Sequence, residues 1–271
     1  AHGPKVASWP MRVATWNVNS LNARWPRVEE WLTSAAPDVV CLQETKLADA
    51  DFPAMALLAL GYESAHHGNG RWNGVAILSK VGLADVAYGF ASPLEGFPDE
   101  PRVVAATCGG VRVRSVYVPN GREIGHDHWH FKLAWLRHLG AELSAEAESG
   151  AAAQLVAGDF NIAPADIDVW NPAAFAGATH VSPEERDALR GLTDLGLVDV
   201  FRAQHPDAGL FSWWDYRAGD FHQGRGMRID LILASVALAE RAEWSLIDRQ
   251  ARKGKLPSDH APVVAQFAPE R

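Results

Sequence analysis

Polar side chains that bind divalent cations or transfer protons recur in this sequence at the ends of short apolar runs. The five segments are Trp16-Asn17-Val18-Asn19, Gln43-Glu44-Thr45-Lys46, Gly158-Asp159-Phe160-Asn161, Arg228-Ile229-Asp230 and Ser258-Asp259-His260. Carboxylates and amides offer the hard oxygen ligands that Mg²⁺ prefers, and a histidine titrates close to neutral pH. Because strand ends from distant parts of a chain commonly converge at one mouth of a sheet, the segments predict a single site for metal-assisted phosphate chemistry.

Short runs rich in Val, Ile and Leu predict the strands that must position these side chains. The expected strands are Arg12 to Trp16, Val39 to Leu42, Val75 to Leu78, Val111 to Val118, Leu155 to Ala157, Ile229 to Leu233 and Pro262 to Phe267. Helical spacing predicts helices over Arg24 to Ala35 and Trp129 to Glu146, and a capping box of Ser182 and Glu185 opens a third helix. The apolar stripe expected on that helix is Leu189, Leu192 and Leu195. Loops are expected at Gly68 to Gly70, Phe90 to Pro101 and Gly219 to Gly226.

Strands mixed with helices, without strict alternation, favour two packed sheets with helices outside over a doubly wound parallel sheet. With 271 residues and 48% hydrophobic content, the chain can build one substantial core, and no linker divides it. We therefore expect one domain over residues 11–271, after a disordered N-terminus over residues 1–10.

The sequence also bears on location. Nowhere do about eighteen apolar residues run together, as a membrane-spanning helix requires, and Ala1 to Pro10 lacks the layout of a secretory signal. Cys41 and Cys108 have the spacing of neither a zinc site nor a disulfide framework. We expect a cytoplasmic monomer with reduced thiols and no membrane partner.

The formal net charge of −8 opposes bulk attraction to nucleic acid, because such binding gains free energy when Lys and Arg displace counterions from phosphates. An enzyme that gathers carboxylates around a metal ion nevertheless spends acidic residues in its site. A local basic face can then be concealed by the total. Net charge therefore leaves nucleic-acid binding open.

Six sequence blocks resemble the motifs of the exonuclease III family of apurinic/apyrimidinic endonucleases, within the endonuclease/exonuclease/phosphatase superfamily. They are Thr15-Trp16-Asn17, Leu42-Gln43-Glu44-Thr45-Lys46, Tyr117-Val118-Pro119-Asn120-Gly121, Gly158-Asp159-Phe160-Asn161-Ile162, Ile229-Asp230-Leu231 and Ser258-Asp259-His260-Ala261-Pro262. The blocks follow the family's order and cover nearly the whole chain. The resemblance implies an α/β fold, a four-layered sandwich of two mixed β-sheets flanked by helices, which deoxyribonuclease I and inositol-phosphate phosphatases share.

The resemblance further implies a Mg²⁺-dependent phosphodiesterase, with Mn²⁺ as an alternative cofactor, whose partner is double-stranded DNA with abasic sites or blocked 3′ ends. Such an enzyme cuts 5′ to the abasic site, leaving a 3′-hydroxyl and a 5′-deoxyribose phosphate, and also works as a 3′-5′ exonuclease or 3′-end-cleaning enzyme. A less selective metal-dependent nuclease and a phosphatase of the same superfamily remain alternatives. A catalytically silent DNA-binding protein would have lost Glu44, Asp159, Asn161 or His260, and all four are present.

Attack on a phosphodiester needs a nucleophilic water and stabilisation of the charge that grows on the phosphoryl oxygens. Asp159 is expected to orient and deprotonate the water, and Asn161 to donate a hydrogen bond to the same centre. His260 is expected to donate to a phosphate oxygen, while Asp230 accepts its other ring N–H. Tyr117 is expected to donate to the phosphate or to position the water.

The expected metal site is centred on Glu44. Its expected helpers are Asn17, Asp259, Asp159 and Asn161. The number of ions stays open. Three residues could also have purely structural roles: Asp230 in an ion pair, Tyr117 as a cap on the core, and Lys46 pairing with an acid instead of contacting phosphate.

The segment Phe211 to Arg217 resembles the family's aromatic segment beside the pocket for the base-less sugar, and Met227 sits where the family carries another large apolar residue. An abasic deoxyribose flipped from the helix is expected to fit against Trp213 and Met227, whereas an intact nucleotide is too bulky. The other expected DNA contacts are Asn120, Arg24, Lys132 and Arg225 at phosphates, Trp72 against the minor groove, and Trp214.

Overall fold

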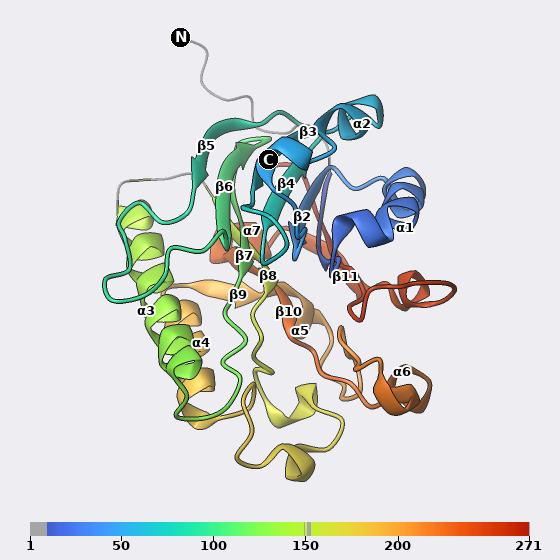
Figure 1. Cartoon of the computed structure of the whole chain (residues 1–271). Helices are drawn as coiled ribbons and strands as arrows, with labels where there is room; N and C mark the ends of the chain where they lie inside the picture. The colour runs from blue at the N-terminus through green and yellow to red at the C-terminus, as the bar shows by residue number, and fades with distance from the viewer. Residues whose placement is uncertain (1–9, 149, 151–152, 271) are drawn as a thin grey trace.

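Two mixed six-stranded sheets pack face to face in the computed structural model, which describes residues 10–148, 150 and 153–270 (Figure 1). The first sheet runs β11 (Ala242–Ile247), β12 (Val263–Phe267), β1 (Met11–Asn17), β2 (Val39–Gln43), β4 (Val75–Ser79) and β3 (Glu63–His67). The second runs β5 (Ala84–Tyr88), β6 (Val103–Cys108), β7 (Val111–Tyr117), β8 (Gln154–Asp159), β10 (Asp230–Ser235) and β9 (Leu197–Asp199). The expected N-terminal disorder falls on residues that, apart from residue 10, lie outside the described part of the chain.

Helices cover the outer faces of the sheets. In Figure 1, α1 (Leu21–Ala35) and α2 (Ala54–Ala59) lie on one side of the molecule, and α3 (Asp127–Glu148) and α4 (Pro183–Thr193) lie on the other. The shorter helices are α5 (Val200–Gln204), α6 (Asp220–Gln223) and α7 (Val236–Ala239), and single 3₁₀ turns cover Asp49–Asp51, Asp166–Asp168, Pro172–Phe175, Arg217–Gly219 and Arg249–Arg252. Among the described residues, no helix is both long and apolar enough to cross a membrane.

Alternation along the strands builds separate cores on the two faces of each sheet. Along β1, Val13 joins the core between the sheets, whereas Ala14 and Trp16 pack toward α1 with Trp31 and Leu32. A third core lies under α3 and α4, where their leucines meet apolar side chains of β7, β8 and β10. These layers confirm the expected four-layered sandwich of two mixed sheets flanked by helices.

The capping box of α4 is confirmed. Ser182 Oγ accepts a hydrogen bond from the Glu185 amide, and Glu185 Oε2 accepts one from the Ser182 amide. Leu189 and Leu192 are buried, but Leu195 lies beyond the end of the helix and is 43% exposed, so its place in the stripe was wrong. The loop expected at residues 219–226 contains α6, a second departure from expectation.

Strand register brings the polar strand ends together. Asn17 on β1 pairs with Gln43 on β2, so Glu44 follows directly beside it. In the second sheet, Tyr117, Asp159 and Asp230 lie side by side across β7, β8 and β10. The long loops that follow β8 and precede β10 lie below these strand ends in Figure 1 and surround the same mouth.

Candidate active site

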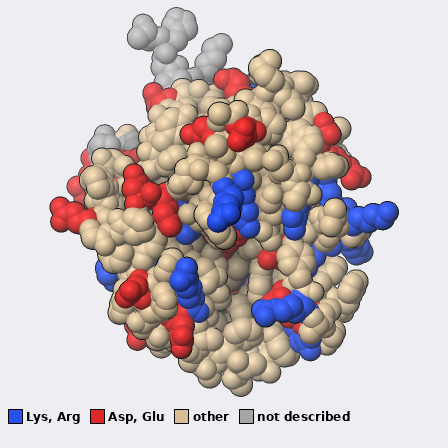
Figure 2. All heavy atoms as spheres, in the orientation of Figure 1, with Lys and Arg blue, Asp and Glu red and all other residues tan. Residues whose placement is uncertain are grey.

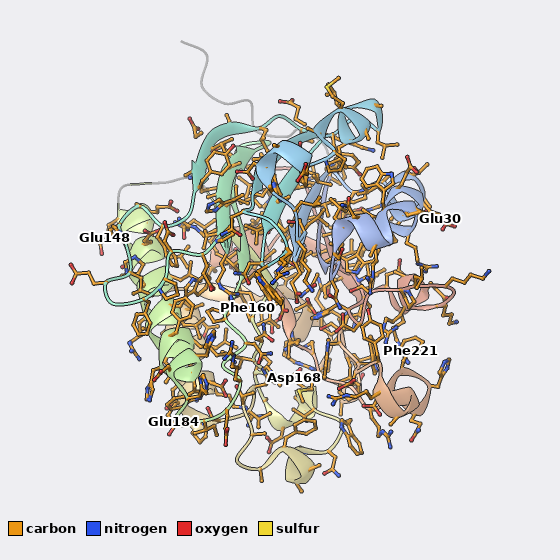
Figure 3. The ribbon with its side chains drawn as sticks, viewed as in Figure 1. Glu30, Glu148, Phe160, Asp168, Glu184 and Phe221 are labelled. Atoms are coloured by element: carbon orange, nitrogen blue, oxygen red, sulfur yellow. The ribbon has the colours of Figure 1, made fainter. Side chains whose placement is uncertain are left out.

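Two carboxylates and one imidazole meet where the sheets face each other. Glu44 follows β2, Asp159 ends β8, and His260 lies just before β12. One oxygen or nitrogen atom from each of the three lies within 4.8 Å of those from the other two, a spacing that a metal ion can bridge. Phe160, the neighbour of Asp159 in the chain, is labelled near the centre of Figure 3 and is fully buried. Each sheet therefore contributes part of the site: Glu44 and His260 adjoin strands of the first sheet, and Asp159 belongs to the second.

Asn17 bridges the two carboxylates. Its side-chain nitrogen donates to Glu44 Oε1 and to Asp159 Oδ2, both at 2.9 Å, while its oxygen accepts from the Asn19 amide. In this arrangement Asn17 aims both carboxylates at one space, and its oxygen keeps a second lone pair with which it can still contribute to the metal site.

Glu44 is ionised at neutral pH. The Lys46 ammonium lies 2.8 Å from Glu44 Oε2, and although burial raises the pKa of this carboxyl, Lys46 and the hydrogen bond from Asn17 outweigh burial and keep the pKa below its usual value. Lys46 also donates to Asn19 Oδ1. Of the two interpretations left open for Lys46, the structure shows the pairing with an acid.

The Asp230 carboxylate holds the His260 ring in position through Nδ1. Its Nδ1 lies 2.9 Å from Asp230 Oδ2, which also accepts a hydrogen bond from Ser212 Oγ at 2.6 Å. Burial by itself lowers the pKa of His260, but the carboxylates of Asp230 and Asp159 outweigh it and raise the pKa to about 10. The ring is thus a cation whose Nε2–H points toward Asp159 Oδ2, 3.8 Å away. This is a group prepared to donate to an anion.

Asp159 and Asn161 form one hydrogen-bonded unit. The Asn161 amide donates to Asp159 Oδ1 at 2.9 Å, and Asn161 itself has a left-handed φ of 51°. Burial raises the pKa of Asp159 to about 7 against the opposing charge of His260. Such a carboxylate is suited to take up a proton at neutral pH.

Tyr117 lies beside Asp159 in the sheet and is half-buried. Burial raises its pKa well above the ordinary value, so its hydroxyl stays protonated and is a donor. The Arg102 guanidinium lies 4.7 Å from the ring centroid and fixes the ring from one side.

Three expected contacts change once the structure is known. Asp259 accepts from Asn19 at 3.0 Å and from Trp213 Nε1 at 3.1 Å, so its carboxylate is engaged outside the group of three. Lys132 was expected at DNA phosphate, but its ammonium is fully buried against Glu185. Trp214 is only 1% exposed and packs in the core, so it does not face DNA.

Trp213 lines a pocket of about 250 Å³ beside the site. Met227 is almost fully buried but forms part of the lining, and Phe175, His180 and Trp170 complete the apolar and aromatic walls. Trp213 makes isolated β-bridges to both Met227 and His260. These backbone contacts hold the Trp213 wall of the pocket next to His260.

The remaining expected DNA contacts are exposed or partly exposed side chains. Trp72 is 65% exposed and Asn120 is exposed. Arg24 donates to the hydroxyl of Tyr216 at 2.9 Å, and Arg225 pairs with Asp220 while lining the pocket. In Figure 2, Lys and Arg side chains are spaced around a hollow near the middle of the face shown.

Some residues that complete the site were not expected from the sequence. Ser212 supports Asp230, Asn19 links Lys46 to Asp259, and Ser258 Oγ donates to the backbone oxygen of Asn17 at 2.7 Å. Asn19 and Ser258 lie inside the polar segments, and Ser212 lies inside the aromatic one. Their position in those motifs was the available signal, but a serine or asparagine at a strand end has many ordinary uses.

Comparison with known proteins agrees with this geometry. Residues 14–260 match the Endonuclease/Exonuclease/phosphatase family. The chain is 36% identical to exodeoxyribonuclease III of Haemophilus influenzae over 95% of this chain and 100% of that protein, and 30% identical to the DNA repair nuclease APEX1 of Danio rerio, covering 95% and 82%.

Solved structures are similar over nearly the whole chain. An AP endonuclease from Archaeoglobus fulgidus has 36% identity and a TM-score of 0.90, covering 95% of this chain and 99% of that one. The 3′-5′ exonuclease NExo from Neisseria meningitidis has 40% identity and a TM-score of 0.91, covering 95% and 100%. NExo, described also as a 3′ phosphatase, was solved bound to a product DNA hairpin. From its sequence, its two sheets and the side chains at their mouth, this chain belongs to the Endonuclease/Exonuclease/phosphatase family.

Proposed function

We propose that this chain is a divalent-metal-dependent DNA-repair hydrolase that cuts the phosphodiester 5′ to an abasic site and also processes 3′ ends. The observation that carries the proposal is the placement of the Trp213 pocket directly beside the charged mouth. Relatives named as exodeoxyribonuclease III, AP endonucleases and a DNA repair nuclease support it. Against a small-molecule phosphatase stands this aromatic pocket, together with the exposed side chains of Trp72 and Asn120.

The residues present fit a hard divalent cation. Glu44 and Asp159 are oriented by the same Asn17 amide toward one space, which is a donor set suited to Mg²⁺, with Mn²⁺ as an alternative. The Nδ1 atom of His260 lies against Asp230, and we assign the other ring nitrogen to the phosphate instead of to the cation. When bound, the cation would neutralise charge that develops on the phosphoryl oxygens.

The side chains divide the rest of the chemistry. Asp159, steadied by the backbone N–H of Asn161, takes the proton of the water that attacks phosphorus. The bond from phosphorus to O3′ breaks, and O3′ takes up a proton from solvent water and leaves as the 3′-hydroxyl. His260 donates a hydrogen bond to a phosphate oxygen, and the hydroxyl of Tyr117 provides a second donor. The products are a 3′-hydroxyl and a 5′-deoxyribose phosphate.

The pocket supplies selectivity. An abasic deoxyribose turned out of the helix lies against Trp213 and Met227, while a nucleotide that keeps its base pays for unstacking and must fit a pocket of about 250 Å³. Arg24, Arg225 and Asn120 at the rim contact phosphates, and Trp72 lies against the minor groove. Double-stranded DNA is therefore the proposed partner.

A second candidate is an enzyme confined to 3′ ends, acting as an exonuclease or 3′ phosphatase. It is favoured by the 40% identity to NExo, compared with 36% for the Archaeoglobus fulgidus AP endonuclease. The same charged mouth serves both candidates, because a terminal 3′ phosphate and an internal phosphodiester need the same donors. Only the way the DNA enters differs.

Four end-labelled duplexes, each incubated with the full chain and Mg²⁺, separate these functions. The first carries a single abasic-site analogue, and the second is its undamaged counterpart with blunt 3′-hydroxyl ends. The third is the undamaged duplex with a 3′ phosphate, and the fourth is the undamaged duplex with a nick. The expected result is one cut 5′ to the lesion, removal of the 3′ phosphate, and complete loss of both with EDTA. Equal degradation of the damaged and undamaged duplexes would indicate a general nuclease. Removal of the phosphate without the cut at the lesion would establish the second candidate, and persistence of activity in EDTA would contradict the metal requirement.

Trp213→Ala is expected to lower the preference for abasic over undamaged duplex by about 10-fold, because the pocket loses the face against which the sugar packs. Cleavage of the abasic duplex at saturating enzyme should fall less. The measurement is the ratio of kcat/KM for the two duplexes. Leu256→Ala, an exposed apolar residue outside the pocket, is the matched control. An unchanged ratio in Trp213→Ala would show that Trp213 only packs.

We also propose that the chain works as a monomer in the cytoplasm. Cys41 and Cys108 are both buried and free, as in proteins of reducing compartments. Light scattering of the purified chain gives the mass that checks the first part of this proposal.

A further inference from the structure

The turn that carries Glu44 is conformationally unusual. Glu44 and Lys46 both have left-handed φ angles, 51° and 54°, which residues other than glycine rarely adopt. Backbone of this kind persists only where neighbouring contacts hold it in place. Thr45, between the two, makes those contacts.

Thr45 is held on three sides. Its backbone N–H donates to Gly74 at 3.1 Å, and its backbone oxygen accepts from Leu21 at 3.0 Å. Its hydroxyl lies 2.8 Å from Nε2 of His66. A Cβ added to Gly74 would come within 2.2 Å of this hydroxyl oxygen, so the Thr45 side chain fits closely between Gly74 and the imidazole.

His66, on β3, is itself fixed. Its ring stacks on Phe52 with centroids 4.1 Å apart, and Asp49 Oδ1 lies 2.8 Å from its Nδ1. Burial lowers the pKa of His66 to about 4, so the ring is neutral. With its proton on Nδ1, toward the Asp49 carboxylate, Nε2 is left to accept the hydrogen bond from the Thr45 hydroxyl. A Cβ on Gly68 would come within 2.5 Å of the ring, which shows how closely the slot fits.

We propose that His66 is a positioning residue: by accepting the hydrogen bond of the Thr45 hydroxyl, it locks the turn and sets the Glu44 carboxylate at the place where it holds the divalent cation. The inference rests on the proposed function, because that function assigns Glu44 to the metal. His66 acts through Thr45, and the Asp49 carboxylate lies beside the other ring nitrogen, 2.8 Å from Nδ1. Mutation of a residue that holds a metal ligand in place in this way typically lowers metal affinity or activity by about 10- to 100-fold.

Two pairs of variants test the contact. Thr45→Val removes the hydroxyl and keeps the shape, whereas Thr45→Ser keeps the hydroxyl. His66→Leu removes the acceptor, whereas His66→Gln places an amide oxygen near the position of Nε2. Thr33→Val is the matched control, because its exposed hydroxyl donates to the Glu29 carbonyl within α1, away from the turn that carries Glu44.

The primary readout is the dissociation constant for Mn²⁺ alone, measured by electron paramagnetic resonance on DNA-free protein, with the Mg²⁺ concentration for half-maximal cleavage as the second. Thr45→Val and His66→Leu are expected to weaken Mn²⁺ binding about 10-fold or more. Thr45→Ser, His66→Gln and Thr33→Val should stay within about 3-fold of wild type. Combining Thr45→Val with His66→Leu should add little, because both remove the same contact.

The outcomes separate this inference from the function on which it rests. If Glu44→Gln weakens Mn²⁺ binding and Thr45→Val does not, the positioning role is overturned and the proposed function stands. Equal weakening by Thr45→Val and Thr45→Ser also overturns it, because the hydroxyl would then not be what holds the turn. A wild-type chain that neither binds Mn²⁺ nor cleaves DNA overturns the proposed function and the inference together.

Discussion

Asp159→Asn is expected to reduce kcat on abasic duplex by about 10² to 10⁴-fold while leaving the fold and DNA binding nearly unchanged. In the proposed mechanism, the substitution removes the carboxylate that takes the proton of the attacking water, a role confined to the transition state. It keeps the side-chain volume and one oxygen that accepts from Asn17 or Asn161. It also removes a buried negative charge whose desolvation opposes folding.

The measurement is single-turnover cleavage of the abasic duplex, with DNA affinity and thermal unfolding recorded on the same preparation. Asp187→Asn is the matched control, because this aspartate lies on the surface of α4 and pairs with Arg190 of the same helix. The assignment fails if Asp159→Asn weakens DNA binding as much as it slows cleavage. In that case, the carboxylate would serve binding or structure instead of the chemical step.

Lys132→Met is expected to have the largest effect on stability, a loss of about 3–5 kcal/mol in the free energy of unfolding. The side chains of Lys132 and Glu185 are both 0% exposed, and their charged atoms lie 2.5 Å apart. Lys132 also donates to the backbone oxygens of Asn120 and Asn161. Methionine fills the space but leaves the Glu185 carboxylate buried without its countercharge and both carbonyl oxygens without this donor.

Chemical denaturation measures this loss, and the melting temperature should fall by roughly 6–20 °C for a chain of this size. Lys255→Met, on an exposed loop, should change the free energy of unfolding by no more than about 0.5 kcal/mol. Adding Glu185→Gln to Lys132→Met should recover part of the loss, since no uncompensated charge then remains. A melting temperature within 2 °C of wild type in the single variant would show that solvent reaches Glu185 and that the pair does not stabilise the fold.

The sequence predicted the central strands better than the outer ones. All seven expected strands are present, because buried runs of Val, Ile and Leu leave a clear pattern. The four edge strands, β3, β5, β9 and β11, were missed: every residue of β5 is exposed, for example, and β9 has only three residues. β6 was missed although it is apolar, because Ala105 and Ala106 suit helix and strand alike.

The segments that build the site were also foreseen, but the direction of individual side chains was not. Trp213 and Trp214 are adjacent in an extended segment, so they point to opposite sides, one into the pocket and the other into the core. Lys132 follows a helical pattern that places it on the inner face of α3, where only a buried partner could keep it charged. That partner, Glu185, is far away in sequence, and no local pattern reveals the pairing.

The two halves of the mouth belong to different sheets. Asn17, Glu44 and His260 come from the first, and Asp159 and Asp230 from the second. A slip of one sheet along the other by a single residue, about 3.3 Å, would separate the carboxylates that Asn17 now joins. The apolar layer between the sheets therefore keeps the two parts of the site aligned. Substitutions that loosen this layer should lower turnover while each sheet is still folded.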